Sequence, residues 1–102
     1  MDYYIYMIRC QDNSLYTGIT TDIKRRYEEH KNGTGAKYTK AKKVLQLEIF
    51  FRCEGRSNAS KVECFIKGLS KVKKEYYLNE IKDFKKLIQR ELGIKIDVQK
   101  FF

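Results

Sequence analysis

The segment YYIYMIRCQDNSLYTGIT, residues 3–20, decides the fold of this sequence. Aromatic and β-branched residues, which favour extended strands, dominate residues 3–10 and 15–20. Between these two runs lie residues 11–14, a polar cluster in which aspartate, asparagine and serine favour a turn. Two such runs joined by a short polar turn predict an antiparallel hairpin at the start of the chain.

The hairpin is followed by the patterns of a helix, a loop and a strand. Residues 22–31 start with a capping aspartate and stop before Asn32-Gly33, so we expect a helix there. Residues 33–43 are rich in lysine and too polar for a core, which predicts a flexible loop. Residues 45–52 alternate between apolar and polar side chains and predict a half-buried third strand.

Helical spacing dominates the C-terminal half of the chain. Ser57 is the expected N-cap of a second helix, and a lysine-rich third helix follows Ser70. Residues 81–92 have the pattern of an amphipathic helix that stops at Gly93, and residues 94–98 alternate like a strand. The last two residues, both phenylalanine, are apolar enough that we expect them to dock.

These patterns together predict an α/β (α+β) fold. We expect a small, three-stranded, mainly antiparallel sheet flanked by helices, in the order β-β-α-β-α-α. Residues 1–78 hold this arrangement, and residues 79–102 are expected to be a packed extension of the same domain.

Length and composition limit the function. The chain has 102 residues, of which 42% are hydrophobic, enough for one core but not for two domains. Its net charge of +9 predicts a polyanionic partner, because binding to phosphates releases counterions. No run approaches the roughly 18 apolar residues of a spanning helix, and the start lacks a basic signal segment. We therefore expect a cytoplasmic protein without a membrane partner. Apolar neighbours predict that Cys10, Cys53 and Cys64 are buried thiols.

One group of side chains has the types that phosphodiester hydrolysis needs: Tyr6 and Tyr16 in the hairpin, Arg26 and His30 in the first helix, and Glu63 in the second. Arg26 and His30 are four residues apart and therefore share a helix face. Hydrolysis needs a base for the attacking water, a cation for the charge on phosphorus and an oxygen ligand for a hard divalent cation. A phenol or imidazole, a guanidinium and a carboxylate meet these needs.

Each of these residues also has a purely structural interpretation. Tyrosine favours strands whatever the function. Glu63 could complete a capping box with Ser60, and Arg26 could belong to a solvated helix face. His30 could interact with the dipole at the C-terminal end of its helix.

The tripeptide Tyr4-Ile5-Tyr6, followed ten residues later by Tyr16-Thr17-Gly18, resembles the paired motifs of the GIY-YIG nuclease superfamily. Tyr4 stands in place of the first glycine, and Thr17 in place of the second isoleucine. The resemblance covers residues 3–78 and points to the small stand-alone bacterial branch of YhbQ-like proteins.

This resemblance implies a metal-dependent endonuclease that cuts DNA by a single in-line attack of water. It implies that Tyr16 is the general base and that Tyr6 orients water or phosphate. It also implies that Arg26 stabilises the phosphate charge and that Glu63 is the only protein ligand of Mg²⁺ or Mn²⁺. His30 matches a histidine that takes over or assists base catalysis in part of the superfamily.

The expected partner is DNA. We expect the nucleic acid to contact Gly18, Arg25, Lys37, Tyr38, Lys40 and Lys73. No module for direct base readout is present, so we expect low sequence preference and selection by DNA shape, such as branched or damaged DNA in repair or recombination. The sequence leaves the oligomeric state open between a monomer and a weak dimer.

Two positions depart from the superfamily pattern. Ile19 stands where a lysine is frequent, and Glu75 stands where an asparagine is frequent. These departures motivate an alternative, a nucleic-acid-binding module of the same fold with weak or no cleavage. A second alternative is a protein-interaction domain that uses the apolar stripe of residues 81–92 while the charge serves solubility.

Overall fold

The computed structural model describes residues 1–99 of the chain. Its N-terminal hairpin pairs β1 (Asp2–Cys10) with β2 (Leu15–Thr20) in antiparallel register, with Tyr6 opposite Gly18. In the turn between them, the Asp12 carboxylate accepts a hydrogen bond of 3.0 Å from the Ser14 backbone N–H. The predicted hairpin is therefore confirmed.

The sheet has four strands in the order β2-β1-β3-β4, so the prediction of three strands is wrong by one. β3 (Val44–Glu54) pairs antiparallel with β1, and β4 (Asp97–Gln99) pairs antiparallel with the outer edge of β3. The fourth strand is only three residues long, which makes its alternating pattern a weak signal. The expected docking of the two C-terminal phenylalanines lies outside the described residues.

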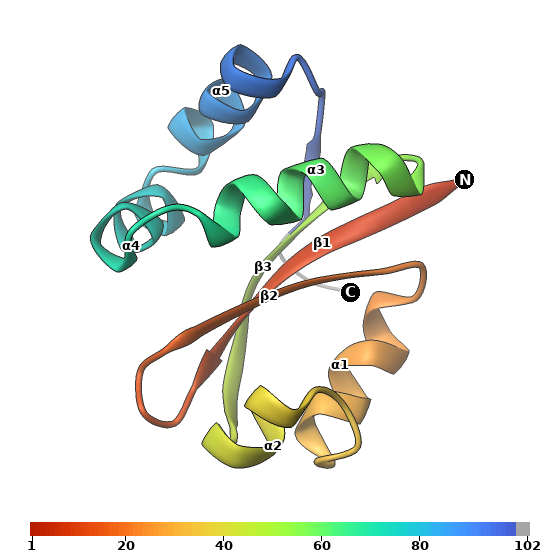
Figure 1. Ribbon diagram of the computed structural model, residues 1–102, viewed down its shortest axis with the longest axis vertical. Coiled ribbons are helices and arrows are strands. Elements are labelled where there is room, and N and C mark those ends of the chain that lie inside the picture. The colour runs from red at the N-terminus through yellow and green to blue at the C-terminus, as the bar shows by residue number, and fades with distance from the viewer. Residues whose placement is uncertain (100–102) are drawn as a thin grey trace.

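Helices cover both faces of the sheet (Figure 1). The helices of residues 1–99 are α1 (Ile23–Lys31), α2 (Lys37–Lys42), α3 (Arg56–Lys67), α4 (Lys71–Asn79) and α5 (Ile81–Leu92). Asp22 caps α1 by accepting a hydrogen bond of 3.1 Å from the backbone N–H of Arg25, so this helix begins within one residue of its predicted start. In Figure 1, α3, α4 and α5 lie on one side of the sheet, and α1 and α2 lie on the other.

Two apolar clusters fill the spaces between these layers. Phe51 belongs to the cluster under α3 and α5, whereas Phe50 belongs to the cluster under α1. Successive strand residues point to opposite faces, and both of these phenylalanines are at most 1% exposed. β3 is therefore buried on both faces at residues 49–51, whereas residues 45–48 are exposed or partly exposed, so the prediction of a half-buried strand is wrong only for the central part of β3.

Residues 33–43 are not the flexible loop that their polarity predicts. They contain α2, in which Thr39 is the one buried residue, at 1% exposure, while the lysines point outward. A helix whose inward face is a single threonine has no apolar pattern to reveal it. The consequence for the site is large, because Thr39 contacts His30.

The start of α3 also differs from the prediction. This helix begins at Arg56, directly after Gly55, whose φ of 83° is readily adopted by glycine. Ser57 therefore lies inside the helix and is not its N-cap. Glu63 lies several residues further in, so a capping box with Ser60 is excluded. Cys64 faces outward and is exposed, contrary to expectation.

The apolar stripe of α5 belongs to the core. Phe84 and Ile88 are fully buried, and Phe84 packs edge-on against Phe51 with ring centroids 5.3 Å apart. Gly93, in the left-handed region at φ 67°, ends the helix. The alternative of a protein-interaction domain built on this stripe is therefore wrong, because the fold itself covers the stripe. Across residues 1–99, every helix is too short or too polar to span a bilayer.

A buried arginine ties the sheet to α4. The Arg9 guanidinium, with the residue only 9% exposed, donates to Glu75 Oε1 at 2.7 Å, to Glu48 Oε2 at 2.9 Å and to the carbonyl of Asn13 at 3.2 Å. The hydrogen bonds from Arg9 lower the pKa of Glu75 to about 2. Glu75, at the position that departs from the superfamily pattern, thus holds the fold together.

Candidate active site

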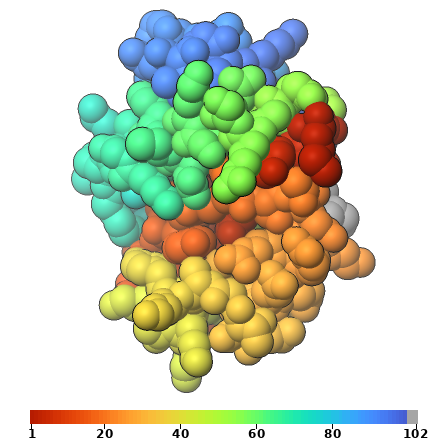
Figure 2. All heavy atoms as spheres, turned by 45° about the vertical axis from the view of Figure 1, so that its right-hand side comes forward, coloured from red at the N-terminus to blue at the C-terminus, as the bar shows by residue number. Residues whose placement is uncertain are grey.

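A groove separates α3 from α1 and α2. Figure 2 shows it as a hollow across the molecule, with the hairpin at its floor. At one end it opens into a polar cavity of about 340 Å³ lined by side chains that include Arg25 and Arg26 of α1, Thr20 of β2 and Arg56 of α3. The sequence analysis missed Arg56, which follows a turn glycine and belongs to no charge cluster.

Tyr6 lies beside this groove, at the centre of a buried hydrogen-bond chain. Its hydroxyl oxygen is 2.8 Å from His30 Nε2, and His30 Nδ1 is 2.6 Å from the Thr39 hydroxyl oxygen. The Thr39 hydroxyl in turn donates to the carbonyl of Ala36 at 3.1 Å. Tyr6, His30 and Thr39 are each 1% exposed, so water cannot replace any of these bonds.

The direction of the chain follows from the need to satisfy every buried donor. The Ala36 carbonyl can only accept, so the Thr39 proton points to it and His30 Nδ1–H donates to Thr39. His30 Nε2 then accepts the proton of the Tyr6 hydroxyl. The opposite direction would leave the Tyr6 O–H without an acceptor among the described residues, at a cost of about 1–3 kcal/mol.

The electrostatics of the pair agree with neutral side chains at physiological pH. Burial raises the pKa of Tyr6 to about 12, although the Arg26 guanidinium beside its hydroxyl acts in the opposite direction. The charges of Tyr16 and Glu63 add to the rise, which shows that both lie near Tyr6. Burial, with a smaller effect of Arg26, lowers the pKa of His30 to about 4.

Tyr16 extends this aromatic group toward the surface. Its ring centroid is 5.1 Å from that of His30 and 6.3 Å from that of Tyr6. On its other side it stacks against Tyr38, at 5.8 Å and an interplanar angle of 30°. Tyr16 is partly exposed, and within residues 1–99 its hydroxyl has no hydrogen-bond partner. This phenol is therefore open to a water or a ligand.

Gly18 makes the close packing of the tyrosines possible. A Cβ atom at this position would lie 2.4 Å from the Tyr6 hydroxyl oxygen and 3.2 Å from the Tyr16 ring. The first of these distances is too short for any side chain. The absence of a side chain at Gly18 brings the β2 backbone against the Tyr6 hydroxyl.

Two charged residues come from different helices. Arg26 of α1 pairs with Glu29 at 3.0 Å and lies next to the Tyr6 hydroxyl. Glu63 of α3 is 23% exposed at its side chain, and its Oε2 is 3.4 Å from Lys67 Nζ. The structure thus brings the phenols, the imidazole and the guanidinium together, with the Glu63 carboxylate close enough to act on Tyr6.

Glu63 is the member of this donor set that suits a divalent cation. Within residues 1–99 no group of three or more His, Cys, Asp and Glu side chains could enclose a metal ion. Glu63 is a partly exposed carboxylate at an open groove, which suits a cation that keeps most of its water, as Mg²⁺ does. His30 does not suit a metal, because both its ring nitrogens are engaged.

The residues expected to contact DNA are distributed unevenly around the groove. Arg25 lines its polar cavity, and Tyr38 stands at its α2 side, 39% exposed. Lys37 and Lys40 are exposed on α2. Lys73 is exposed on α4.

Thr39 is a second residue of the site that the sequence analysis missed. It sits in a polar segment and has no motif, so its own neighbours do not reveal it. The one available signal was His30: a histidine that turns inward from a helix needs a polar partner for its second nitrogen. Only the position of α2 shows which residue that is.

Comparison with known proteins agrees with this geometry. The family model of the GIY-YIG catalytic domain matches residues 2–76. The fold and this match define the class of protein, a GIY-YIG nuclease domain.

Similar proteins narrow the class. A UPF0213 protein of Fusobacterium nucleatum subsp. nucleatum is 47% identical over 96 residues, which are 94% of this chain and 96% of that protein. The UPF0213 protein YhbQ of Salmonella arizonae is 44% identical over 86 residues, 84% of this chain and 86% of that protein. The solution NMR structure of a UPF0213 protein from Bacillus halodurans superimposes with a TM-score of 0.52 at 38% identity, covering 78% of this chain and 84% of that one. The chain therefore belongs to the GIY-YIG superfamily, in its UPF0213 branch.

Proposed function

We propose that the protein is a divalent-metal-dependent endonuclease or nickase that hydrolyses phosphodiester bonds of DNA with low sequence preference. The observation that carries this proposal is the convergence of Tyr6, Tyr16, Arg26 and His30 beside one groove, within electrostatic reach of Glu63. The cavity at the groove is open and lined by arginines that suit phosphates, which supports selection by DNA shape, such as branched or damaged DNA in repair or recombination.

Tyr16 is the group that meets the attacking water in this proposal. Its hydroxyl is unengaged within residues 1–99 and its ring is held between His30 and Tyr38. As a phenolate it takes a proton from the water while the water oxygen forms a bond to phosphorus. The ester bond on the opposite side breaks, and the leaving oxygen takes a proton from solvent.

Arg26 and Tyr6 hold the phosphate. The Arg26 guanidinium carries a fixed positive charge at the groove and offsets the negative charge that develops on the phosphate oxygens. Tyr6 stays protonated at physiological pH, and its O–H is committed to His30. The lone pair of its oxygen is therefore a hydrogen-bond acceptor with a fixed direction, and this acceptor would orient the water or the phosphate.

His30 acts through Tyr6 in this arrangement. It is 1% exposed and therefore cannot reach a water in the groove directly. By accepting the Tyr6 proton it fixes the direction of the phenol, which makes it a positioning residue. Of the two candidate general bases, Tyr16 and His30, this arrangement favours Tyr16.

Glu63 is the proposed ligand of Mg²⁺ or Mn²⁺. When bound, such a cation lowers the pKa of its water and neutralises charge on the phosphate. Glu63 would hold the cation through its one carboxylate, at the edge of the groove. Arg25, Lys37, Tyr38, Lys40 and Gly18 are proposed to contact the DNA on either side of the cut, with Lys73 at a more distant phosphate.

Nicking of supercoiled plasmid in the presence of Mg²⁺ or Mn²⁺ tests the proposal. Glu63→Gln should lower the rate at least a hundredfold, and Tyr16→Phe should lower it by about the same factor. Glu28→Gln, which removes an equal charge from an exposed pair with Lys31, should leave the rate unchanged. Equal rates for the wild type and Glu63→Gln would contradict the nuclease proposal.

One observation favours the second candidate, a DNA-binding module with weak or no cleavage. Glu75 is held by Arg9 and by Lys71, and Ile19 offers no charge, so neither position supplies the polar group frequent in the superfamily. In that case the wild type would bind plasmid tightly, with an affinity that falls steeply with salt, but would not nick it.

A further inference from the structure

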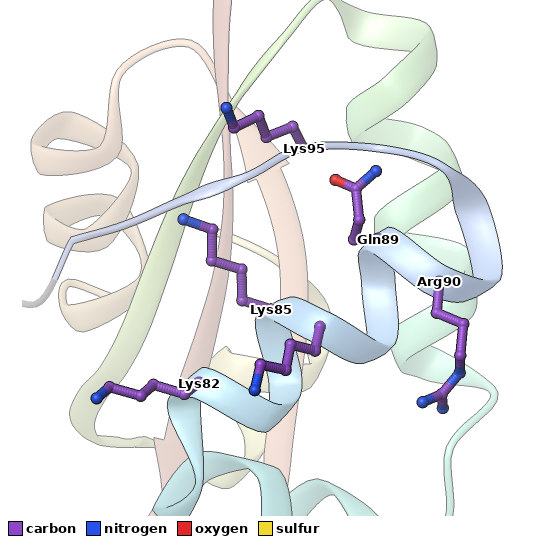
Figure 3. Close-up of a pocket in the computed structure, with 6 residues that line it drawn as sticks. Lys82, Lys85, Gln89, Arg90 and Lys95 are labelled. Atoms are coloured by element: carbon purple, nitrogen blue, oxygen red, sulfur yellow. The ribbon is translucent and has the colours of Figure 1, made fainter.

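A second basic surface lies on α5, away from the candidate active site. A hollow of about 460 Å³ is lined there by Lys82, Lys85, Lys86, Gln89, Arg90 and Lys95, which we call the α5 surface. Figure 3 shows the side chains of Lys82, Lys85 and Lys95 extending to one side, whereas Gln89 and Arg90 lie on the other side of the view. No carboxylate lines this hollow among the described residues.

The charges of this surface are not compensated within the domain. Residues 81–96 contain five basic and two acidic side chains. Of the two acids, Glu91 lies 3.5 Å from Arg90, and Asp83 accepts a hydrogen bond of 3.2 Å from Tyr76. Within residues 1–99 the four lysines of the α5 surface form no ion pair. Like charges three and four residues apart on a helix repel one another, so a bound anion would relieve a repulsion that the free domain carries.

The chemistry of the α5 surface favours a phosphate backbone over a bilayer. A helix that binds membranes buries its apolar face among lipids, but the apolar face of α5 is already buried against the sheet through Phe84 and Ile88. What remains outside is a row of ammonium groups on flexible stems, with one amide among them. Such a row neutralises regularly spaced phosphates without reading bases.

The position of the surface shows which DNA it would meet. The groove of the candidate active site has β2 at its floor, whereas α5 packs on Phe51 of β3 and lies near β4. β2 and β4 are the opposite edges of the sheet. Duplex DNA has a persistence length of about 50 nm, so bending one short duplex from the groove to the opposite edge of a domain of 35 × 31 × 22 Å would cost considerable bending energy, which a second, separate segment would avoid.

We propose that the α5 surface binds the phosphate backbone of a second duplex segment, such as another arm of a branched DNA, while the groove holds the segment that is cut. This inference rests on the proposed function for its partner, DNA, but not on cleavage. With two separate contact surfaces, the affinity of the domain for DNA would depend on how two duplex segments are oriented relative to each other.

Fluorescence anisotropy in EDTA tests this inference without cleavage. The probes are a four-way junction and a short linear duplex, and the variant is Lys82→Gln/Lys85→Gln/Lys95→Gln. We expect at least a tenfold loss of affinity for the junction, a salt slope that is smaller by about 2–3, and duplex affinity unchanged within about twofold. The matched control is Lys31→Gln/Lys42→Gln/Lys61→Gln, which removes the same charge, two of the three lysines being paired with Glu28 and Asp12.

Three results would overturn the inference: junction binding equal to that of the control variant, equal losses on both probes, or a loss of binding to phosphatidylserine vesicles with DNA binding intact. The proposed function fails separately, when the wild type does not nick plasmid above the level of Glu63→Gln. A protein that binds the junction through α5 but does not cut it would support the inference and contradict the nuclease.

Discussion

Replacing Thr39 by valine removes the outermost side chain of the hydrogen-bond chain behind Tyr6. The substitution keeps the shape of the side chain but removes the hydroxyl that lies 2.6 Å from His30 Nδ1. Because His30 is 1% exposed, its N–H then has no acceptor. An unsatisfied buried donor costs about 1–3 kcal/mol, and each kcal/mol lowers the Tm of a small domain by roughly 4–8 °C, so we expect a fall of about 5–20 °C.

Thermal unfolding followed by circular dichroism measures this fall. The control is Thr34→Val, at an exposed threonine whose hydroxyl bonds the Glu29 carbonyl at 3.2 Å, and it should change stability by less than about 0.5 kcal/mol. His30 is the only histidine in the sequence, so its ring nitrogens can be assigned directly by NMR. A wild-type imidazole that carries its proton on Nε2, or a Thr39→Val variant as stable as the wild type, would refute the assigned chain.

Three further predictions concern Gly18, His30 and Glu75. Gly18→Ala places a methyl group 2.4 Å from the Tyr6 hydroxyl oxygen and should slow plasmid nicking about a hundredfold; a normal rate would exclude Tyr6 from the site. The pKa of His30 is about 4 in the fold against 6.5 when exposed, so the unfolded chain binds the proton first and stability should decline as the pH falls from 6.5 to 4. Urea unfolding should show this decline in the wild type and not in His30→Phe over pH 6.5–5, above the range where Glu75 titrates. Glu75→Gln leaves Arg9 with one carboxylate partner and should lower the free energy of unfolding by about 1–3 kcal/mol. The control Glu91→Gln, at a pair of exposed side chains, should leave this free energy unchanged. Equal free energies of unfolding for the two variants would show that the ion pair of Arg9 with Glu75 does not stabilise the fold.

The hairpin and the helices other than α2 could be predicted because each has a local signal. Runs of aromatic and β-branched residues mark β1 and β2, and Asp22 and Gly93 mark helix ends. α2 could not be predicted, because its inward face is a single threonine and its burial depends on a histidine nine residues earlier in the chain. The alternation of residues 94–98 indicated a strand near β4, but it could not show that the three residues Asp97–Gln99 join the sheet beside β3.

The candidate site shows the same division. Motif spacing was enough to name Tyr6, Tyr16, Arg26 and Glu63 as a group, and the structure brings them near one another. Spacing could not show that His30 is buried behind Tyr6, because burial depends on elements that meet only in the fold. For the same reason the sequence could not predict the ion pair of Arg9 with Glu75, whose positions in the chain differ by 66.

The contact of Tyr6 with Gly18 also fixes the register in which β1 pairs with β2. Sliding β2 by two residues would keep its side chains on their proper faces, yet it would set Tyr6 opposite Tyr16 or Thr20 instead of a residue without a side chain. The space that the Tyr6 hydroxyl now fills would then be occupied, and its bond to His30 could not form. A hairpin in the slipped register would therefore lose the geometry of the site. The nicking activity of a sample would then be proportional to the fraction of molecules in which β1 and β2 pair in the correct register.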